Sequence, residues 1–200
     1  MILFVDLEHE STYTKPKTDW LLAARTRISY RLQDITGRPC LLQRYRHVTP
    51  TLLSELGIAA VFISGQGADR DLYDPAETAG LRAVVREATV PVFGFCGGLQ
   101  FIAEAWEVPV ERVGPIPDDE QDPHPEYQPG WVKEVGYLPV EVTADHPMVA
   151  GLGSEPVFRH AHTWELKGVP DGFTVLAGTD VTPVQLVAHD DHRQGGAQFH

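Results

Sequence analysis

The most informative part of this chain is the stretch Val90-Pro91-Val92-Phe93-Gly94-Phe95-Cys96-Gly97-Gly98, an apolar run that ends in a thiol enclosed by glycines. The run has the composition of a buried strand, and a helix is predicted from Leu99 to Trp106. Small neighbours let the backbone turn sharply and present the sulfur above the sheet edge, as in a nucleophile elbow. At a helix N-terminus, the macrodipole is expected to lower the pKa of the thiol. Cys96 is therefore the candidate nucleophile.

Strand-like and helix-like segments alternate along the first half of the chain. Strands are predicted at residues 2–7, 39–45, 58–64 and 90–95, and helices at 18–34, 49–56 and 75–88. This alternation favours a doubly wound, flavodoxin-like α/β fold, in which a mainly parallel central sheet carries helices on both faces. Ligands of such sheets bind at the carboxyl ends of the strands, where Cys96 is placed.

Shorter β-like runs follow Trp106, at residues 131–142, 155–166, 173–178, 183–189 and 196–200. We expect them to form a C-terminal antiparallel extension that returns the last strand beside Cys96, so that residues 1–200 make one domain. The last run ends in His200. An imidazole there is the kind of base that a cysteine nucleophile needs for proton transfer, so Cys96 and His200 are the predicted catalytic pair.

Two segments carry a family resemblance. Gly94-Phe95-Cys96-Gly97-Gly98-Leu99-Gln100 and Gly196-Ala197-Gln198-Phe199-His200 resemble, in this order and spacing, the signature segments of class I glutamine amidotransferases. The resemblance implies an enzyme without a cofactor that hydrolyses the side-chain amide of L-glutamine through a γ-glutamyl thioester on Cys96. The ammonia would pass to a partner synthase subunit or domain. No Gly-x-x-x-x-Gly-Lys-Ser/Thr loop is present, so an ATP-using amination step would lie elsewhere.

The resemblance also implies roles for residues around the elbow. The backbone N–H groups of Gly97 and Gln66 would form the oxyanion hole. Gln66 and Gly67 depart from the usual Ser-Gly-Gly-Pro turn of the family, which puts the orientation of the Gln66 peptide in question. The residues expected to contact the substrate are Gly65, Gln100, Ala161 and His162.

His160 and His162 lie one residue apart, so a strand would point both rings to one face, as two metal ligands require. No third ligand accompanies them at a suitable spacing, and no metal site is expected.

In the resembled family, Pro-Glu follows the histidine, and the glutamate orients the imidazole. The sequence given ends at His200. We expect it to be truncated just after the catalytic histidine, which would leave the activity of this fragment in question. A Cys–His dyad and a carboxylate supplied from elsewhere in the chain are the alternatives.

Charge, hydrophobic content and cysteine count indicate which partners and which location the protein has. The 28 acidic and 16 basic side chains give a net charge of −12, which disfavours a nucleic acid partner. No apolar stretch is long enough to span a membrane. With two cysteines and no signal peptide at Met1, a cytoplasmic location is expected, with Cys40 as buried filler. The acidic segment 115–129 is expected to be a solvated loop, with a docking surface for a basic partner as the alternative.

Three other functions remain open on the sequence alone. They are a stand-alone γ-glutamyl hydrolase, a noncatalytic regulatory module with the same fold, and a member of the wider group of cysteine-elbow proteins that includes redox chaperones and peptidases. Gln100 and the terminal Gln198-Phe199-His200 favour the amidotransferase branch over this last group.

Overall fold

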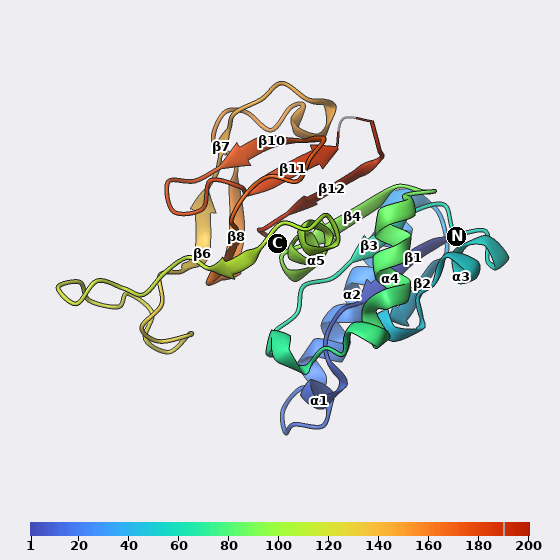
Figure 1. Cartoon of the computed structure of the whole chain (residues 1–200), viewed down its shortest axis with the longest axis horizontal. Coiled ribbons are helices and arrows are strands. Elements are labelled where there is room, and N and C mark those ends of the chain that lie inside the picture. The colour runs from blue at the N-terminus through green and yellow to red at the C-terminus, as the bar shows by residue number, and fades with distance from the viewer. Residues whose placement is uncertain (190) are drawn as a thin grey trace.

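The computed structural model describes residues 1–189 and 191–200. Its largest sheet has the strand order β2-β1-β3-β4-β12-β11-β10-β7 (Figure 1). The strands are β1 (Ile2–Asp6), β2 (Cys40–Arg44), β3 (Val61–Ile63), β4 (Val92–Phe95), β7 (Glu141–Val142), β10 (Phe173–Gly178), β11 (Leu186–His189) and β12 (Gln194–Ala197). The first five strands in the sheet order run parallel to one another, and the last three continue the sheet in antiparallel fashion. The predicted α/β fold with an antiparallel extension is confirmed.

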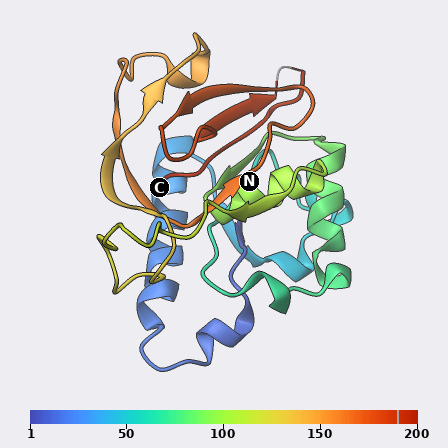
Figure 2. The same ribbon diagram turned by 60° about the vertical axis from the view of Figure 1, so that its left-hand side comes forward.

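Helices cover both faces of the parallel strands (Figure 2). They are α1 (Glu10–Tyr13), α2 (Asp19–Thr36), α3 (Pro50–Glu55), α4 (Pro75–Glu87) and α5 (Gly97–Ala105), with short 3-10 turns at η1 (Tyr45–His47), η2 (Arg70–Leu72) and η3 (Pro147–Val149). Alternation along β1 explains the two layers. Leu3 and Val5 join the core cluster that includes α4 and α5, whereas Ile2 and Phe4 pack with Leu32 of α2. Among the described residues, no helix combines the length and apolarity needed to cross a bilayer.

Local signals in the sequence fix where the main helices begin and end. Asp74 caps α4 by accepting a hydrogen bond from the backbone of Ala76, and proline occupies the first position of that helix. Thr49 caps α3 in the same way. Helix α2 ends at Gly37, whose φ of 64° is the left-handed conformation that glycine adopts readily.

The second half of the chain differs from the prediction in two respects. Strand β12 ends at Ala197. It runs parallel to β4, because the hairpin between β11 and β12 reverses the direction of the chain. The segments predicted at 131–142 and 155–166 do not simply extend the main sheet. They form two smaller pairs, β6 (Glu134–Pro139) with β8 (Val157–His162), and β5 (Val110–Arg112) with β9 (Trp164–Leu166). Pro139 lacks an N–H group, so the first segment divides there, and only β7 joins β10.

The acidic segment 115–129 extends from the body of the protein in Figure 1 and is organised around one cation. The ammonium of Lys133 is buried and donates to both carboxylate oxygens of Asp122 at 2.9 Å. It also donates to the carbonyl oxygens of His124, Tyr127 and Gln128. The segment is therefore folded around an internal charge, which a fully solvated loop would not be.

Candidate active site

The turn between β4 and α5 has the geometry of a nucleophile elbow. Cys96 adopts φ 50° and ψ −108°, a conformation that is strained for a residue with a side chain. Its N–H group donates to the carbonyl oxygen of Ala197 at 2.6 Å, which joins the elbow to β12. The flanking glycines are required by close packing. A Cβ atom at Gly94 would lie 2.3 Å from the carbonyl carbon of Gly98, and one at Gly98 would lie 2.4 Å from the Ile63 oxygen.

The thiol of Cys96 is buried at the start of α5. Gln198 donates to its Sγ atom from 3.4 Å, and the Gly97 N–H group also bonds to it. Burial nevertheless raises the pKa of the thiol to about 11. The predicted lowering of this pKa is therefore wrong for this state of the site, because loss of hydration outweighs the stabilisation that these hydrogen bonds give the thiolate.

His200 lies on the same side of the molecule as the thiol. A Cβ atom at Gly65 would lie 3.3 Å from Cε1 of His200 and 3.5 Å from Cβ of Cys96, so the two side chains flank one glycine. The His200 N–H group donates to the Arg159 carbonyl at 2.8 Å, which holds the residue against β8. Loss of hydration, followed by the charge of Arg159, lowers the pKa of the imidazole to about 4. Within residues 1–189 and 191–200, no carboxylate side chain bonds to this ring.

Gln66, whose N–H group is the second one predicted for an oxyanion hole, lies in the turn after β3. The Gly65 carbonyl accepts hydrogen bonds from Nη2 of Arg25 and from Oγ of Ser64, both at 2.9 Å. Because the peptide is trans, the Gln66 N–H group points away from Arg25. A Cβ atom at Gly97 would lie 2.9 Å from the Gln66 nitrogen. Gln66 also avoids the left-handed region, so its side chain adds no backbone strain.

Two buried charged residues that are not among the predicted site residues hold this turn. Glu8 accepts hydrogen bonds from the N–H groups of Gly67 at 2.7 Å and Ala68 at 3.0 Å. Arg25 forms a buried ion pair with Asp6 at 2.8 Å. The available signal was the pair of carboxylates directly at the carboxyl end of the first apolar strand, where the turns of a parallel sheet converge.

Gln100 is buried beside the thiol, and both ends of its carboxamide are occupied by protein groups. Its Nε2 donates to Oε1 of Gln198 at 3.0 Å, and its Oε1 accepts from Nη1 of Arg70 at 2.9 Å. Arg70 also pairs with Glu104 on α5. A chain of hydrogen bonds thus runs from Arg70 to the sulfur, and substrate contact by Gln100 stays a prediction.

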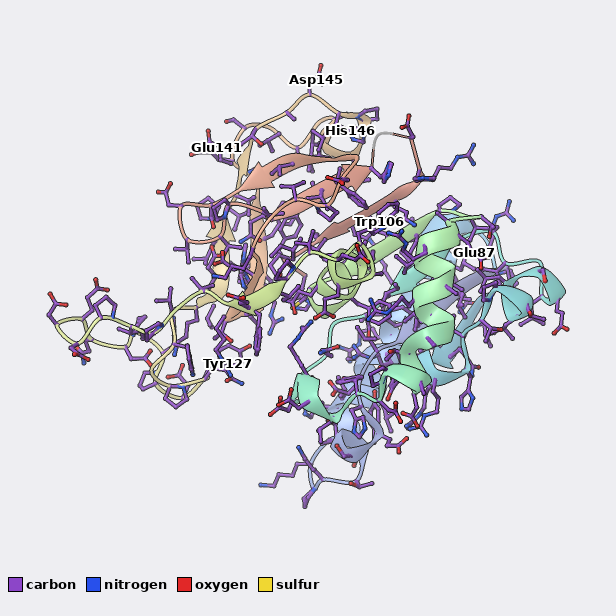
Figure 3. All side chains as sticks on the ribbon, viewed as in Figure 1. Glu87, Trp106, Tyr127, Glu141, Asp145 and His146 are labelled. Atoms are coloured by element: carbon purple, nitrogen blue, oxygen red, sulfur yellow. The ribbon has the colours of Figure 1, made fainter. Side chains whose placement is uncertain are left out.

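The remaining predicted substrate contacts lie on β8. The Ala161 carbonyl accepts a hydrogen bond at 2.9 Å from the hydroxyl of Tyr127, which reaches it from the acidic segment (Figure 3). The imidazole of His162 is buried and engaged elsewhere. Its Nδ1 bonds to the Trp164 carbonyl, and its Nε2 lies 3.2 Å from Oε2 of Glu134. Any contact of His162 with a ligand at Cys96 would therefore come from its backbone.

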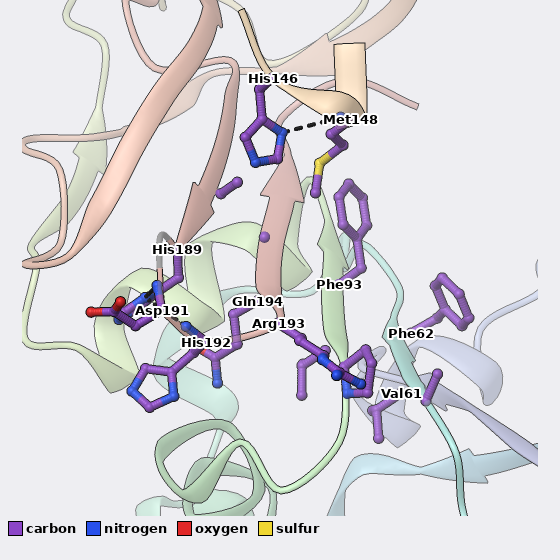
Figure 4. A pocket seen from close by; sticks show the side chains of 15 residues that line it. Val61, Phe62, Phe93, His146, Met148, His189, Asp191, His192, Arg193 and Gln194 are labelled. Atoms are coloured by element: carbon purple, nitrogen blue, oxygen red, sulfur yellow. Dashed lines mark hydrogen bonds between the residues drawn. The ribbon is translucent and has the colours of Figure 1, made fainter. Parts of the chain in front are cut away.

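Two hollows in the described part of the chain bear on the location of the site. The smaller, of about 140 Å³, is bordered by Gln66 and Arg70 and so adjoins the oxyanion turn. The larger, of about 400 Å³, is lined by Val92 and Gln194 where β4 and β12 begin, with His146, Met148 and His192 around it (Figure 4). It lies at the amino ends of these strands, whereas Cys96 lies past the carboxyl end of β4. Since ligands of parallel sheets bind at carboxyl ends, cavity size does not identify the site here.

Comparisons with known sequences agree with this geometry. The family described as glutamine amidotransferase class-I matches residues 34–200. A GMP synthase [glutamine-hydrolyzing] from Symbiobacterium thermophilum is 28% identical over 186 residues, which is 90% of this chain and 30% of the relative. The enzyme of the same name from Xanthomonas oryzae pv. oryzae is 28% identical over 178 residues, or 86% of this chain and 30% of the relative. The chain thus spans less than a third of the length of these relatives.

Solved structures show the same fold. A protein from Thermoplasma acidophilum, described as a candidate GMP synthase subunit, superposes with a TM-score of 0.69 at 20% identity, covering 100% of this chain and 84% of the other. A glutamine amidotransferase from Thermotoga maritima gives a TM-score of 0.65 at 14% identity, covering 100% of this chain and 75% of the other. With the family match over residues 34–200 and the elbow at Cys96, this chain belongs to the class I glutamine amidotransferases.

Proposed function

We propose that this chain hydrolyses the side-chain amide of L-glutamine to glutamate and ammonia, with Cys96 as nucleophile and His200 as base. The observation that carries the proposal is the strained elbow at Cys96, which shares Gly65 as a neighbour with the imidazole of His200. A strained backbone persists only where the surrounding structure holds it, and such positions cluster at active sites. The relatives named as glutamine-hydrolysing GMP synthases supply independent support.

In the acylation step, the sulfur of Cys96 bonds to the amide carbon while His200 takes the thiol proton. The resting pKa values, about 11 for the thiol and about 4 for the imidazole, keep both groups neutral at neutral pH. The proton therefore moves as the substrate carbon is attacked. The N–H groups of Gln66 and Gly97 stabilise the oxyanion. Collapse of the tetrahedral adduct breaks the carbon–nitrogen bond, and His200 returns its proton to the departing ammonia.

In the second step, water replaces ammonia as the partner of the imidazole. His200 accepts a proton from water while the oxygen attacks the γ-glutamyl thioester, and the same two N–H groups stabilise the new oxyanion. The carbon–sulfur bond then breaks, and the proton returns to the sulfur. Glutamate leaves, and the site regains its neutral pair.

The ammonia is proposed to serve a synthase that carries the amination step. The chain covers 30% of relatives named GMP synthase, so more than two thirds of their length has no counterpart in these 200 residues. A GMP-forming synthase domain or subunit is therefore the proposed partner, and it would supply the nucleotide-dependent chemistry.

Replacing the nucleophile tests the proposal. Cys96→Ser should lower glutamate release from glutamine by at least about 10³-fold, because the nucleophile and its base act as a unit. Cys40→Ser is the matched control and should retain activity, since Cys40 lies at the start of β2. A glutamine-mimicking electrophile should modify Cys96 ahead of Cys40, as located by peptide mass spectrometry. Undiminished glutamate release by Cys96→Ala would overturn the assignment.

A noncatalytic glutamine-binding module is the second candidate. The observation that favours it is that the Cys96 thiol is already hydrogen-bonded and uncharged: Gln198 donates to the sulfur, and burial raises the pKa of the thiol to about 11. Calorimetry distinguishes the two. A catalytic chain gives continuous heat from turnover that Cys96→Ser abolishes, whereas a binding module gives one saturable binding heat and no glutamate.

A further inference from the structure

Three potential metal ligands gather away from the elbow, between β6 and β8. In the register of this strand pair, Glu134 faces His162, and Gly136 faces His160. Residues at alternate positions share a face, so the two imidazoles and the carboxylate project to the same side. Their donor atoms lie within 4.8 Å of one another, and each residue is no more than 4% exposed. The sequence offered the His-x-His pair but not its partner, because Glu134 is a neighbour only across the strands.

Buried polar atoms without hydrogen bonds concentrate at this place. Among the described residues they include both ring nitrogens of His160 and Oε1 of Gln185, and Nε2 of His162 has only the Glu134 carboxylate beside it. A buried polar atom left unpaired costs about 1–3 kcal/mol, so native proteins rarely leave several together. Gln185 donates a hydrogen bond to Glu134 through its Nε2, so the unpaired Oε1 of the same carboxamide lies near that carboxylate. The arrangement indicates that a ligand belongs among them.

The orientation of His162 shows what kind of ligand fits. A carbonyl oxygen can only accept, so Nδ1 of His162 carries the proton that is directed to Trp164. In the neutral ring, Nε2 then presents a lone pair to Oε2 of Glu134 at 3.2 Å, and two acceptors facing each other repel. A second proton on the ring or a cation bound by both atoms converts this repulsion into attraction, and only the cation would also engage the free nitrogens of His160.

We propose that Glu134, His160 and His162 form a binding site for a divalent cation, with zinc as the ion that best fits. Two imidazoles and one carboxylate are a donor set that zinc takes with a fourth position left for water. Ligand atoms around a tetrahedral zinc lie about 3.4 Å apart. The pair from Glu134 and His162 already has this spacing, at 3.2 Å. The ring of His160 makes no hydrogen bond that would hold it back from closing the remaining distance.

Outer hydrogen bonds already orient two of the three ligands. The Trp164 carbonyl fixes the ring of His162, while Thr179 and Gln185 donate to Glu134 at 2.8 and 2.6 Å. Partners of this type set the orientation of metal ligands in known sites. A bound ion would join β6 to β8, the strand whose Arg159 carbonyl holds His200. The proposed ion would stabilise this strand pair, and its binding does not depend on the proposed glutaminase reaction.

The experiment uses the full chain with Cys96→Ser, which removes the buried thiol as a competing ligand. Protein freed of metal with a chelator is titrated with zinc, and bound metal is counted by mass spectrometry after gel filtration. One zinc per chain is expected, with a rise in Tm. Cobalt in its place should give the visible absorption of a four-coordinate ion. Absence of stoichiometric zinc together with an unchanged Tm would overturn the proposal, leaving a metal-free ion pair between Glu134 and His162.

Ligand variants locate the ion. His160→Gln should abolish stoichiometric binding without breaking a hydrogen bond, because both ring nitrogens are unpaired. His162→Gln should do the same. The matched control, His47→Gln, changes an exposed histidine in η1 and should bind as the parent does. Undiminished zinc binding by His160→Gln would place the ion elsewhere and refute the site. If either variant fails to fold, the cobalt spectrum and the zinc count of the parent still decide.

Discussion

The guanidinium of Arg25 donates a hydrogen bond to the carbonyl oxygen of Gly65 over 2.9 Å, from α2 to the turn that carries Gln66. Asp6 fixes the same guanidinium through a buried ion pair. The side chains of Arg25 and Asp6 therefore hold the orientation of the peptide between Gly65 and Gln66, and these side chains do not reach the thiol. In the oxyanion role proposed for the Gln66 N–H group, a peptide locked in this way needs no reorganisation when charge develops, which is the condition for effective transition-state stabilisation.

Arg25→Lys should separate this positioning effect from charge. Lysine keeps the positive charge but lacks the planar fork that bonds Asp6 and Gly65 together. We expect kcat for glutamate release to fall about 10- to 100-fold, somewhat less than loss of an oxyanion donor, with KM little changed. Arg27→Lys, at an exposed position of α2, is the control and should behave as the parent. An unchanged kcat in folded Arg25→Lys would show that the turn keeps its orientation without this bond.

Gly65→Ala should push apart the side chains of Cys96 and His200, which flank Gly65. The new methyl group would lie 3.3 Å from Cε1 of His200 and 3.5 Å from Cβ of Cys96, and the backbone there does not need glycine for its φ. We expect the chain to fold and kcat to fall about 100-fold, as misplaced reacting groups commonly cause. Gly67→Ala is a control in the same turn, because its methyl group meets only a Glu8 oxygen, at 3.5 Å. Equal kcat values for the two variants would contradict the placement of His200 beside the thiol.

The sequence was sufficient for the features that depend on local pattern. Alternation of strands and helices predicts the parallel sheet, and the glycines around Cys96 predict the elbow, because only a sharp turn needs them packed so closely. The return of β12 beside β4 follows from the two signature segments.

Features that depend on tertiary contact were out of reach. Arg25 and Gly65 are 40 residues apart, and Glu8 and Gly67 are 59 apart, so no periodicity links them. Glu134 becomes a neighbour of His162 only through strand register. The direction of the thiol pKa was wrong for a related reason, since the helix N-terminus is visible in the sequence but the burial that outweighs it is not.

The pH dependence of kcat/KM should show that Cys96 and His200 are both uncharged in the free enzyme at neutral pH. This parameter reports groups of the free enzyme. Above the His200 pKa of about 4, the imidazole is unprotonated and able to accept the thiol proton, and as the pH falls through this value it becomes charged and the rate declines. We expect the acid limb near pH 4, well below the ordinary histidine value of about 6.5. Alkylation of Cys96 should still be accelerating at pH 10, since its thiol pKa is about 11.

The measurement is steady-state glutamate release from about pH 3 to 9, with alkylation followed separately from about pH 7 to 11 by peptide mass spectrometry. A free low-molecular-weight thiol serves as the reference and should level off above its pKa of about 8.5. An acid limb centred near pH 6.5 would mean that the imidazole is hydrated in the working enzyme. A plateau in Cys96 alkylation below pH 9 would likewise contradict the raised thiol pKa.

Lys133→Met should destabilise the folded conformation of the acidic segment 115–129. Its ammonium satisfies Asp122 and three backbone carbonyls, and methionine fills similar volume without replacing any of these bonds. The buried ammonium is the shared donor that holds these acceptors together, so we expect its loss to lower Tm and to speed cleavage by a glutamate-specific protease after Glu120 and Glu126. Since Tyr127 would lose its hold on the Ala161 carbonyl, KM for glutamine should rise more than kcat falls. Lys167→Met, which removes a surface pair with Glu165, is the control. Cleavage of Lys133→Met at the control rate would show that the segment keeps its fold without the ammonium.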